Sequence, residues 1–133
     1  MPQSWEIENF LTVDDARLCI DGVDTEALAR EYGTPLFVFS ELRIRHNIER
    51  IKKAASAIEH PLKLCYAAKS MSTMGILRAV KEAGSDMEVN SGGELWKALK
   101  AGFTGDQINF NGNSKRVMRV MPLRRKVSSL FFL

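Results

Sequence analysis

The sequence has no long apolar run, only two cysteines, and no acidic residue after Asp106. Its apolar runs are a few residues long, whereas a helix that crosses a bilayer needs about 20, so we expect no membrane span. The start at residues 1–6 lacks a basic region followed by an apolar one, and we expect no secretory signal. Cys19 and Cys65 have neither zinc-site spacing nor the density of a disulfide scaffold. These absences favour a cytoplasmic protein with reduced thiols and without a metal site.

The missing acids divide the chain into two regions of opposite charge. Residues 1–106 carry 13 Lys and Arg against all 16 Asp and Glu, a balance of −3, and residues 107–133 carry the other six basic residues, for +6. A nucleic-acid-binding domain would spread basic residues over a folded face, with aromatic residues between them for stacking. We expect no nucleic-acid partner, because the body of this chain is mildly acidic and the basic excess is confined to a tail.

The N-terminal part predicts short elements. Residues 1–24 are compatible with an edge strand and a turn at Asp21-Gly22. Residues 25–32 predict a helix with Thr25 as its N-cap, Glu26 in the first turn and Gly33 in the left-handed C-terminal position.

A strand and a long helix are expected next. Thr34-Pro35 forces extended backbone, and residues 36–39 (Leu-Phe-Val-Phe) predict a strand. Ser40 is expected to cap a helix over residues 41–59, ahead of Pro61. The candidate core contacts of this helix are Leu42, Ile44, His46, Ile48 and Ile51.

From residue 63 the pattern alternates between strands and helices. Strands are expected over residues 63–68, 87–90 and 108–111, and the intervening helices end at Gly84 and Gly102. This alternation predicts βαβ units with parallel pairing, an α/β fold. Lys69, Ser91 and Asn111-Gly112-Asn113 then lie at the carboxyl ends of three successive strands, about 20 residues apart. In a parallel α/β barrel that end carries the active site.

Each of these polar residues also has a purely structural interpretation. Lys69 is either a nucleophilic amine leaving an apolar strand or a solvated lysine, and its position alone favours the second. Ser91-Gly92-Gly93-Glu94 either lets the backbone approach an anion or forms a capping box, and taken alone the box is favoured. Glu88 needs a partner such as Lys69 if its strand face is buried, and none if the face is solvated. His46 and His60 form no ligand pair.

Several motifs in register resemble one known family. Tyr66-Ala67-Ala68-Lys69-Ser70, followed by Ile76-Leu77, Val80 and Gly84, resembles the lysine signature of the ornithine/diaminopimelate/arginine decarboxylases of fold-type III. Residues 20–23 and 32–39 are similar to the N-terminal segment that precedes the barrel in diaminopimelate decarboxylases, the members of this family that the chain resembles most. Residues 91–95, 101–103 and 110–115 continue the match, which spans about residues 16–115.

The resemblance implies an alanine-racemase-like (β/α)8 barrel joined to a β domain, in a homodimer with active sites at the interface. It implies that Lys69 holds pyridoxal 5'-phosphate as a Schiff base, that Glu88 is an acidic residue beside this cofactor, and that Ser91 lies at the matching cofactor-binding strand end. The implied substrate is an amino acid, with meso-diaminopimelate favoured.

The chain departs from the family in two places. Met71 stands where the family commonly has Asn, which affects contacts near the lysine. After Lys115 the expected acidic helix is replaced by a basic segment, interrupted by Pro122, that suggests a frameshift, a truncation or a tail that docks on a partner. We therefore expect an N-terminal lead-in segment (residues 1–35), an incomplete barrel of about three βα units (36–115) and a divergent basic tail (116–133).

The leading functional hypothesis is a fragment of a pyridoxal-phosphate amino-acid decarboxylase, for which we expect no activity on its own, because such a barrel needs roughly 250 residues. One alternative is a non-catalytic protein that binds the cofactor. Another is a short protein that pairs with a partner through its exposed sheet edge.

Overall fold

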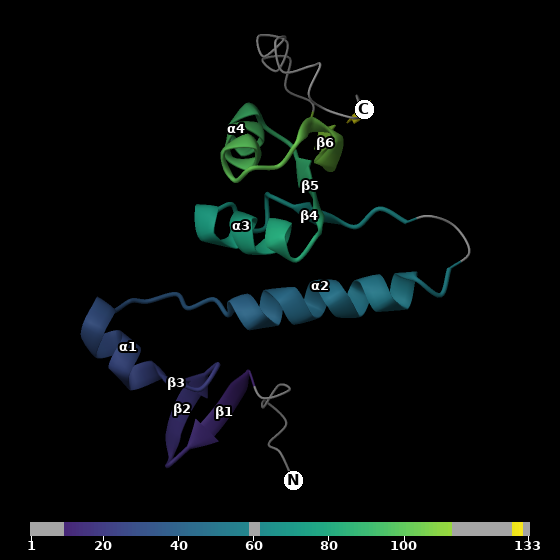
Figure 1. Cartoon of the computed structure of the whole chain (residues 1–133). Coiled ribbons are helices and arrows are strands. Elements are labelled where there is room, and N and C mark those ends of the chain that lie inside the picture. The colour runs from purple at the N-terminus through teal and green to yellow at the C-terminus, as the bar shows by residue number, and fades with distance from the viewer. Residues whose placement is uncertain (1–9, 59–61, 113–128, 132–133) are drawn as a thin grey trace. The chain divides into compact units, whose positions relative to one another are not determined.

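The computed structural model describes residues 10–58, 62–112 and 129–131. The chain divides into two compact units, Met1–His46 and Asn47–Leu133, and the boundary between them falls inside one helix, α2. Figure 1 shows the order of the elements along the chain. No helix in the described ranges is long and apolar enough to cross a membrane. The predicted domain boundaries after residues 35 and 115 stay predictions.

The first unit begins with a three-stranded antiparallel sheet of order β1-β2-β3: β1 (Leu11–Asp14), β2 (Arg17–Ile20) and β3 (Val23–Asp24). Two-residue turns join the strands, and both residues of each turn have positive φ: 46° and 59° at Asp15-Ala16, and 52° and 76° at Asp21-Gly22. Such turns match the right-handed twist of paired strands. The turn predicted at Asp21-Gly22 is confirmed, but it joins two strands of a sheet where a single edge strand was expected.

Helix α1 (Thr25–Tyr32) occupies the predicted residues, but Thr25 is not its N-cap. Asp24 caps it, because its Oδ1 accepts a hydrogen bond from the Glu26 amide at 2.8 Å. Thr25 instead donates its hydroxyl to the Leu18 carbonyl at 2.9 Å. Gly33 closes the helix with a φ of 80°, as predicted.

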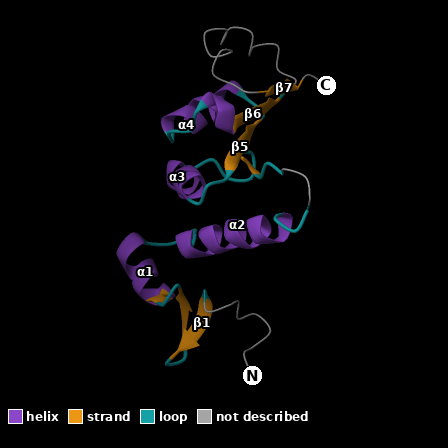
Figure 2. Ribbon diagram, turned by 45° about the vertical axis from the view of Figure 1, so that its right-hand side comes forward, coloured by secondary structure: helices purple, strands orange, loops and turns teal. Residues whose placement is uncertain are grey.

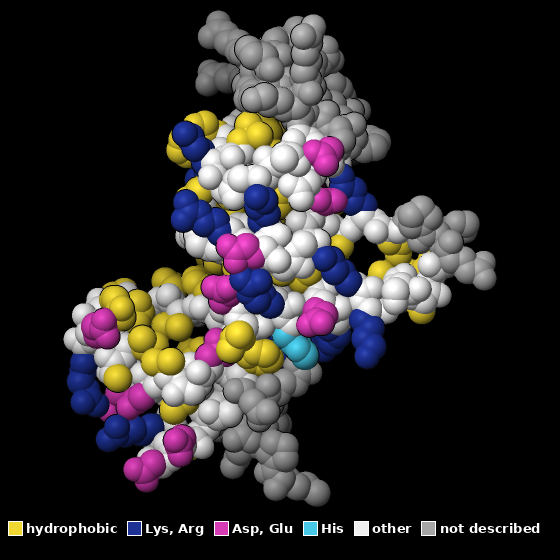
Figure 3. Space-filling model, viewed as in Figure 1, with side chains coloured by type: hydrophobic (Ala, Val, Ile, Leu, Met, Phe, Trp, Pro, Cys, Tyr) yellow, Lys and Arg dark blue, Asp and Glu magenta, His cyan; other side chains and the backbone are white. Residues whose placement is uncertain are grey.

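The strand predicted over residues 36–39 is wrong. The segment follows a cis Thr34–Pro35 peptide, joins no ladder in the described part of the chain, and exposes its apolar side chains, including 84% of Phe37. Figure 3 shows hydrophobic side chains, in yellow, gathered on the surface around α1. β-propensity describes how well a residue fits a paired, half-buried surface, and no neighbouring strand provides that surface here.

Helix α2 (Glu41–Ala55) begins as predicted and ends earlier. Ser40 Oγ accepts a hydrogen bond from the Arg43 amide at 2.8 Å, so Ser40 is the N-terminal cap. Among the predicted core contacts Ile48 is buried, and Ile44 and His46 are half-buried. Leu42 and Ile51 were predicted wrongly, because they are 59% and 48% exposed. His60 and Pro61 lie outside the described residues.

The second unit contains a parallel sheet of order β4-β5-β6-β7. Its strands are β4 (Cys65–Ala67), β5 (Asp86–Val89), β6 (Ile108–Asn111) and β7 (Ser129–Phe131), and the connecting helices are α3 (Met74–Glu82) and α4 (Gly92–Lys100), with a 3-10 turn, η1 (Gly105–Gln107), before β6. Figures 1 and 2 show α3 and α4 on the same side of β4, β5 and β6. The predicted parallel βαβ units are confirmed. β7 was not predicted, and it pairs parallel to β6 from within the segment expected to be a divergent tail.

Strand alternation gives this sheet two different faces. Met87, Val89, Ile108 and Phe110 are almost fully buried on the face covered by the helices, together with Leu77, Val80, Leu95 and Ala98. Asp86, Glu88, Asn109 and Asn111 alternate with them and form a polar face on the other side. The predicted α/β class is therefore confirmed, the described strands form an open sheet, and its closure into a barrel stays a prediction.

Candidate functional site

Three of the predicted site positions lie at the carboxyl end of the parallel sheet, which is called the sheet edge of the candidate site below. Lys69 is in the turn that follows β4, Ser91 follows β5, and Asn111-Gly112 ends β6. Because the three strands run parallel, their carboxyl ends share this edge. Asn113, the last residue of the predicted motif, lies outside the described residues.

Lys69 leaves the sheet directly beside Glu88. Ala67 is in register with Glu88, and the Ala68 amide donates to the Glu88 carbonyl at 2.9 Å. The Ser70 amide closes a turn onto the Ala67 carbonyl at 3.1 Å, so Lys69 points away from the strand and is exposed. Its amine has no hydrogen bond or ion pair with any described residue, which leaves it available to a ligand.

Two hydrogen bonds hold the segment that follows Lys69. The Tyr66 hydroxyl donates to the Met71 carbonyl at 3.1 Å, and Lys97 Nζ donates to the Ser72 hydroxyl at 2.9 Å. Burial raises the pKa of Tyr66, with the Met71 bond opposing this shift. Met71 departs from the family pattern, but its contact here is through the main chain and does not depend on its side chain.

The Glu88 side chain is hydrogen-bonded to the side-chain amide of Asn111, and not to Lys69, among the described residues. Asn111 Nδ2 donates to Glu88 Oε1 at 3.3 Å. The pairing of Glu88 with Lys69 that the sequence suggested for a buried strand face is not formed among the described residues, because this face is partly exposed and the carboxylate needs no cation. Glu88 and Lys69 are nevertheless at the same edge of adjacent strands.

Ser91 has the capping role that its spacing predicted. Its Oγ accepts a hydrogen bond from the Glu94 amide at 3.2 Å and begins α4. The Glu94 carboxylate accepts from the Asn90 amide at 2.7 Å, one residue before the cap. The reciprocal bond of the predicted capping box, from the Ser91 amide to Glu94, is thus replaced by a bond from Asn90. The serine oxygen is thus used by the helix, and its hydroxyl proton remains able to donate to a ligand.

Asn90 is a residue that sequence reasoning missed. Its Nδ2 is buried and has no hydrogen-bond partner in the described structure. Asn90 continues the alternation of Asp86 and Glu88 along β5, and so belongs to the polar face. This alternation is the sequence signal that could have identified Asn90 as a site residue. A buried amide without a partner is costly unless a ligand or water completes it.

A second cross-strand contact on the polar face joins Asn109 and Cys65. Asn109 Nδ2 donates to Cys65 Sγ at 2.8 Å. Burial raises the pKa of the Cys65 thiol, and the hydrogen bond from Asn109 opposes this shift. No group of three His, Cys, Asp or Glu side chains that could hold a metal ion occurs in the described part of the chain.

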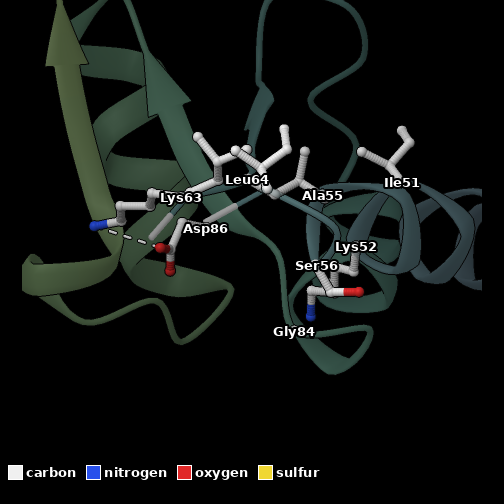
Figure 4. Close-up of a pocket in the computed structure, with 10 residues that line it drawn as sticks. Ile51, Lys52, Ala55, Ser56, Lys63, Leu64, Gly84 and Asp86 are labelled. Carbon is white, nitrogen blue, oxygen red and sulfur yellow. Dashed lines mark ion pairs between the residues drawn. The ribbon is translucent and has the colours of Figure 1, made fainter. Parts of the chain in front are cut away.

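The cavity in Figure 4 belongs to the opposite end of the sheet. It has a volume of about 740 Å³ and is lined by residues of α2 and by the segments before and at the amino ends of β4 and β5, including Leu64 and Asp86. Lys63 forms an ion pair with Asp86 there at 3.4 Å. Since Lys69 emerges from the carboxyl end of β4, this cavity is not part of the candidate site.

Comparisons with known proteins agree on one enzyme family. Residues 43–129 match the family described as "Pyridoxal-dependent decarboxylase, pyridoxal binding domain". Diaminopimelate decarboxylase of Methanothermobacter thermautotrophicus is 41% identical over 103 residues, which is 77% of this chain and 24% of the relative. The Bacillus methanolicus enzyme of the same name is 39% identical over 118 residues, covering 88% of this chain and 27% of the relative.

Solved structures give the same result. A crystal structure of diaminopimelate decarboxylase from M. jannaschii matches with a TM-score of 0.78 and 31% identity, over 92% of this chain and 29% of that chain. A second structure of that protein, in complex with L-lysine, matches equally well. The chain spans about a quarter of the length of the curated relatives it matches. The family match also continues to residue 129, through most of the segment expected to diverge.

Proposed function

Because the chain belongs to the pyridoxal-dependent decarboxylase family, through the pyridoxal-binding domain, we propose that it supplies the cofactor-binding lysine of an amino-acid decarboxylase that acts on diaminopimelate. The observation that carries the proposal is the exposed amine of Lys69, which pairs with no described residue. It lies at the carboxyl end of the parallel sheet, where Glu88, Ser91 and Asn111 also lie.

The residues at this edge fit pyridoxal phosphate. A Schiff base needs an accessible amine, and Lys69 has one. Asn90 Nδ2, at the same end of the sheet, is a buried donor without a partner among the described residues, of the kind that a polar ligand completes. Gly92 and Gly93, at the start of α4, have no β-carbon to keep a ligand away from the backbone.

The chain's own residues have separate roles in this proposal. Lys69 would hold the cofactor through its amine. Glu88 is a carboxylate beside the emerging lysine that orients its amine or keeps it cationic, and Ser91 donates its hydroxyl proton to the cofactor. The bound cofactor supplies a ring that accepts the electrons left when a carboxylate departs as carbon dioxide.

Catalysis is proposed for the longer protein, as found in the relatives. Four strands of an open sheet do not surround a substrate, so we expect no decarboxylation by these 133 residues alone. A homodimer, a cytoplasmic location with Cys19 and Cys65 reduced, and the absence of nucleic-acid and membrane partners belong to the same proposal.

The alternative is a protein that binds the cofactor or a partner without catalysis. It is favoured by the open edge of β4, which pairs with β5 alone among the described strands. An unpaired strand edge offers a row of main-chain donors and acceptors to another chain.

Cofactor binding is tested by trapping. The purified chain is incubated with pyridoxal phosphate, reduced with borohydride and mapped by mass spectrometry. We expect the adduct on Lys69 and its loss in Lys69→Ala, while the control Lys100→Ala, which removes an exposed lysine on α4, keeps it. Equal labelling of all exposed lysines would contradict the assignment.

The reaction is tested in a chimera. Residues 10–112 replace the corresponding segment of the M. thermautotrophicus relative, and carbon dioxide release from meso-diaminopimelate is measured. We expect decarboxylation that Lys69→Ala abolishes. A folded chimera that binds the cofactor at Lys69 without decarboxylating would favour the non-catalytic alternative.

A further inference from the structure

One side-chain contact on the polar face joins a proposed site residue to a residue with no assigned role. Asn111 Nδ2 donates to Glu88 Oε1 across β5 and β6. In the register of these strands Glu88 lies beside Asn109, so Asn111 is the next residue on the same face toward the carboxyl end. Glu88 Oε2 has no hydrogen bond or ion pair with any described residue. One carboxylate oxygen is therefore held, and the other is available.

We propose that Asn111 is a positioning residue that holds the Glu88 carboxylate at the sheet edge where Lys69 emerges. The inference rests on the proposed function, in which Lys69 receives a carbonyl-bearing cofactor. Glu88 and Lys69 are linked by backbone, since the Ala68 amide donates to the Glu88 carbonyl. A freely rotating Glu side chain would sample several rotamers, whereas a hydrogen bond from a neutral amide restricts it without neutralising its charge.

The backbone after Asn111 lies close to the backbone after β5, which places Asn111 within hydrogen-bond distance of Glu88. Gly112, the next residue, packs against the Asn90 carbonyl of the neighbouring strand, in a space that leaves no room for a β-carbon. The backbones at the carboxyl ends of β5 and β6 therefore lie close together, one residue beyond the Asn111–Glu88 pair. A longer separation would break a hydrogen bond that is already 3.3 Å long.

Asn109 provides a matched control on the same strand and face. Its side-chain amide donates to Cys65 Sγ. Asn109→Ala and Asn111→Ala thus remove the same chemical group two residues apart, and Asn111→Ala removes the hydrogen bond to Glu88 Oε1.

The contact is measured first without cofactor. In ¹⁵N-labelled chain the side-chain amide resonances of Asn111 and Asn109 are compared between the native sequence and Glu88→Ala. We expect the Asn111 amide protons to move upfield and those of Asn109 to stay nearly unchanged. An Asn111 amide that does not respond to Glu88→Ala would overturn the proposal, whatever the cofactor does.

The effect on Lys69 is measured next, as the rate of borohydride-trapped adduct formation. We expect Asn111→Ala to slow it roughly three- to tenfold, the range for one typical intramolecular hydrogen bond. Asn111→Gln, which keeps the donor, should recover part of the rate, and Asn109→Ala should leave it unchanged. In the Glu88→Gln background Asn111→Ala should have little further effect, because the two residues act together.

Equal slowing by Asn111→Ala in both backgrounds would overturn the positioning role, since the effect would not pass through Glu88. Absence of any adduct in the native chain would overturn the proposed function and the part of the inference that concerns Lys69. The amide resonances would still decide the contact by themselves, so the two failures are distinguishable.

Discussion

Gly112 packs so closely against Asn90 that a β-carbon on residue 112 would overlap the Asn90 carbonyl oxygen and lie 2.9 Å from the Phe110 ring carbon Cε1. We predict that Gly112→Ala destabilises the second unit by about 1–3 kcal/mol, the usual cost of overpacking. Urea unfolding followed by circular dichroism measures this change. Gly75→Ala is the control, because Gly75 lies in α3 with nothing within 4 Å, and it should be neutral or stabilising. Equal stability of both variants would contradict the close contact.

Leu95 and Trp96 are adjacent in α4 and differ in burial. Leu95 is 2% exposed and packs into the core, so Leu95→Ala should cost about 2–5 kcal/mol of unfolding free energy. Trp96 is 58% exposed, and the Lys100 ammonium lies 5.8 Å from its ring centroid, so Trp96→Ala should cost about 0.5–1 kcal/mol. Thermal unfolding of the two variants tests the order, and a larger loss at Trp96 would show that α4 is rotated from the position described.

Ser91 and Thr73 are the N-caps of α4 and α3, and only Ser91 has a side-chain cap hydrogen bond. Ser91→Ala should lower the unfolding free energy by about 1 kcal/mol, a typical loss for a bonded cap. Thr73→Ala should change it less, since no such bond is lost. Chemical denaturation of both variants supplies the measurement. If Ser91→Ala also lowers cofactor trapping at Lys69 while Ser91→Thr restores both properties, the hydroxyl serves the helix and the ligand.

Asp24 couples the stability of the first unit to pH. The hydrogen bond from the Glu26 amide is the main cause that holds the pKa of Asp24 below its usual 3.8, with desolvation opposing and the Arg17 hydrogen bond adding to it. A carboxyl whose pKa is lower when folded stabilises the fold above its unfolded pKa, and this contribution is lost as the pH falls through the folded value. We therefore expect helicity of α1 to fall as the pH drops below about 3.8, and to fall less steeply in Asp24→Asn. Amide resonances of residues 25–32 recorded over this range test it, and identical profiles would exclude Asp24 as the cause.

The elements that could be predicted from the sequence are those set by local periodicity. The alternation of Met87 with Glu88, the glycines that end α3 and α4 and the Ser91 cap each depend on residues a few positions apart, and all of them have their expected structural roles. The other half of the predicted capping box differs, because the Glu94 carboxylate accepts from the Asn90 amide. Thr25 was predicted wrongly as the N-cap, because Asp24, one residue earlier, accepts the hydrogen bond from the Glu26 amide. Leu42 and Ile51 were candidate core contacts because they belong to the apolar side chains of this helix. The sequence pattern does not show which of those side chains another element covers, and these two are exposed.

The candidate site divides in the same way. By itself the sequence determined that Lys69, Ser91 and Asn111 lie at the carboxyl ends of strands. That Lys69 is the cofactor lysine is a prediction from a family resemblance. Only the tertiary structure decided that, among the described residues, Glu88 pairs with Asn111 and not with Lys69, and that the side-chain Nδ2 of Asn90 is buried without a partner. It also decided that Gly112 has no room for a side chain and that a fourth strand, β7, joins the sheet. The physical reason is that these contacts depend on the register between strands about 20 residues apart, which the alternation within any one strand leaves open.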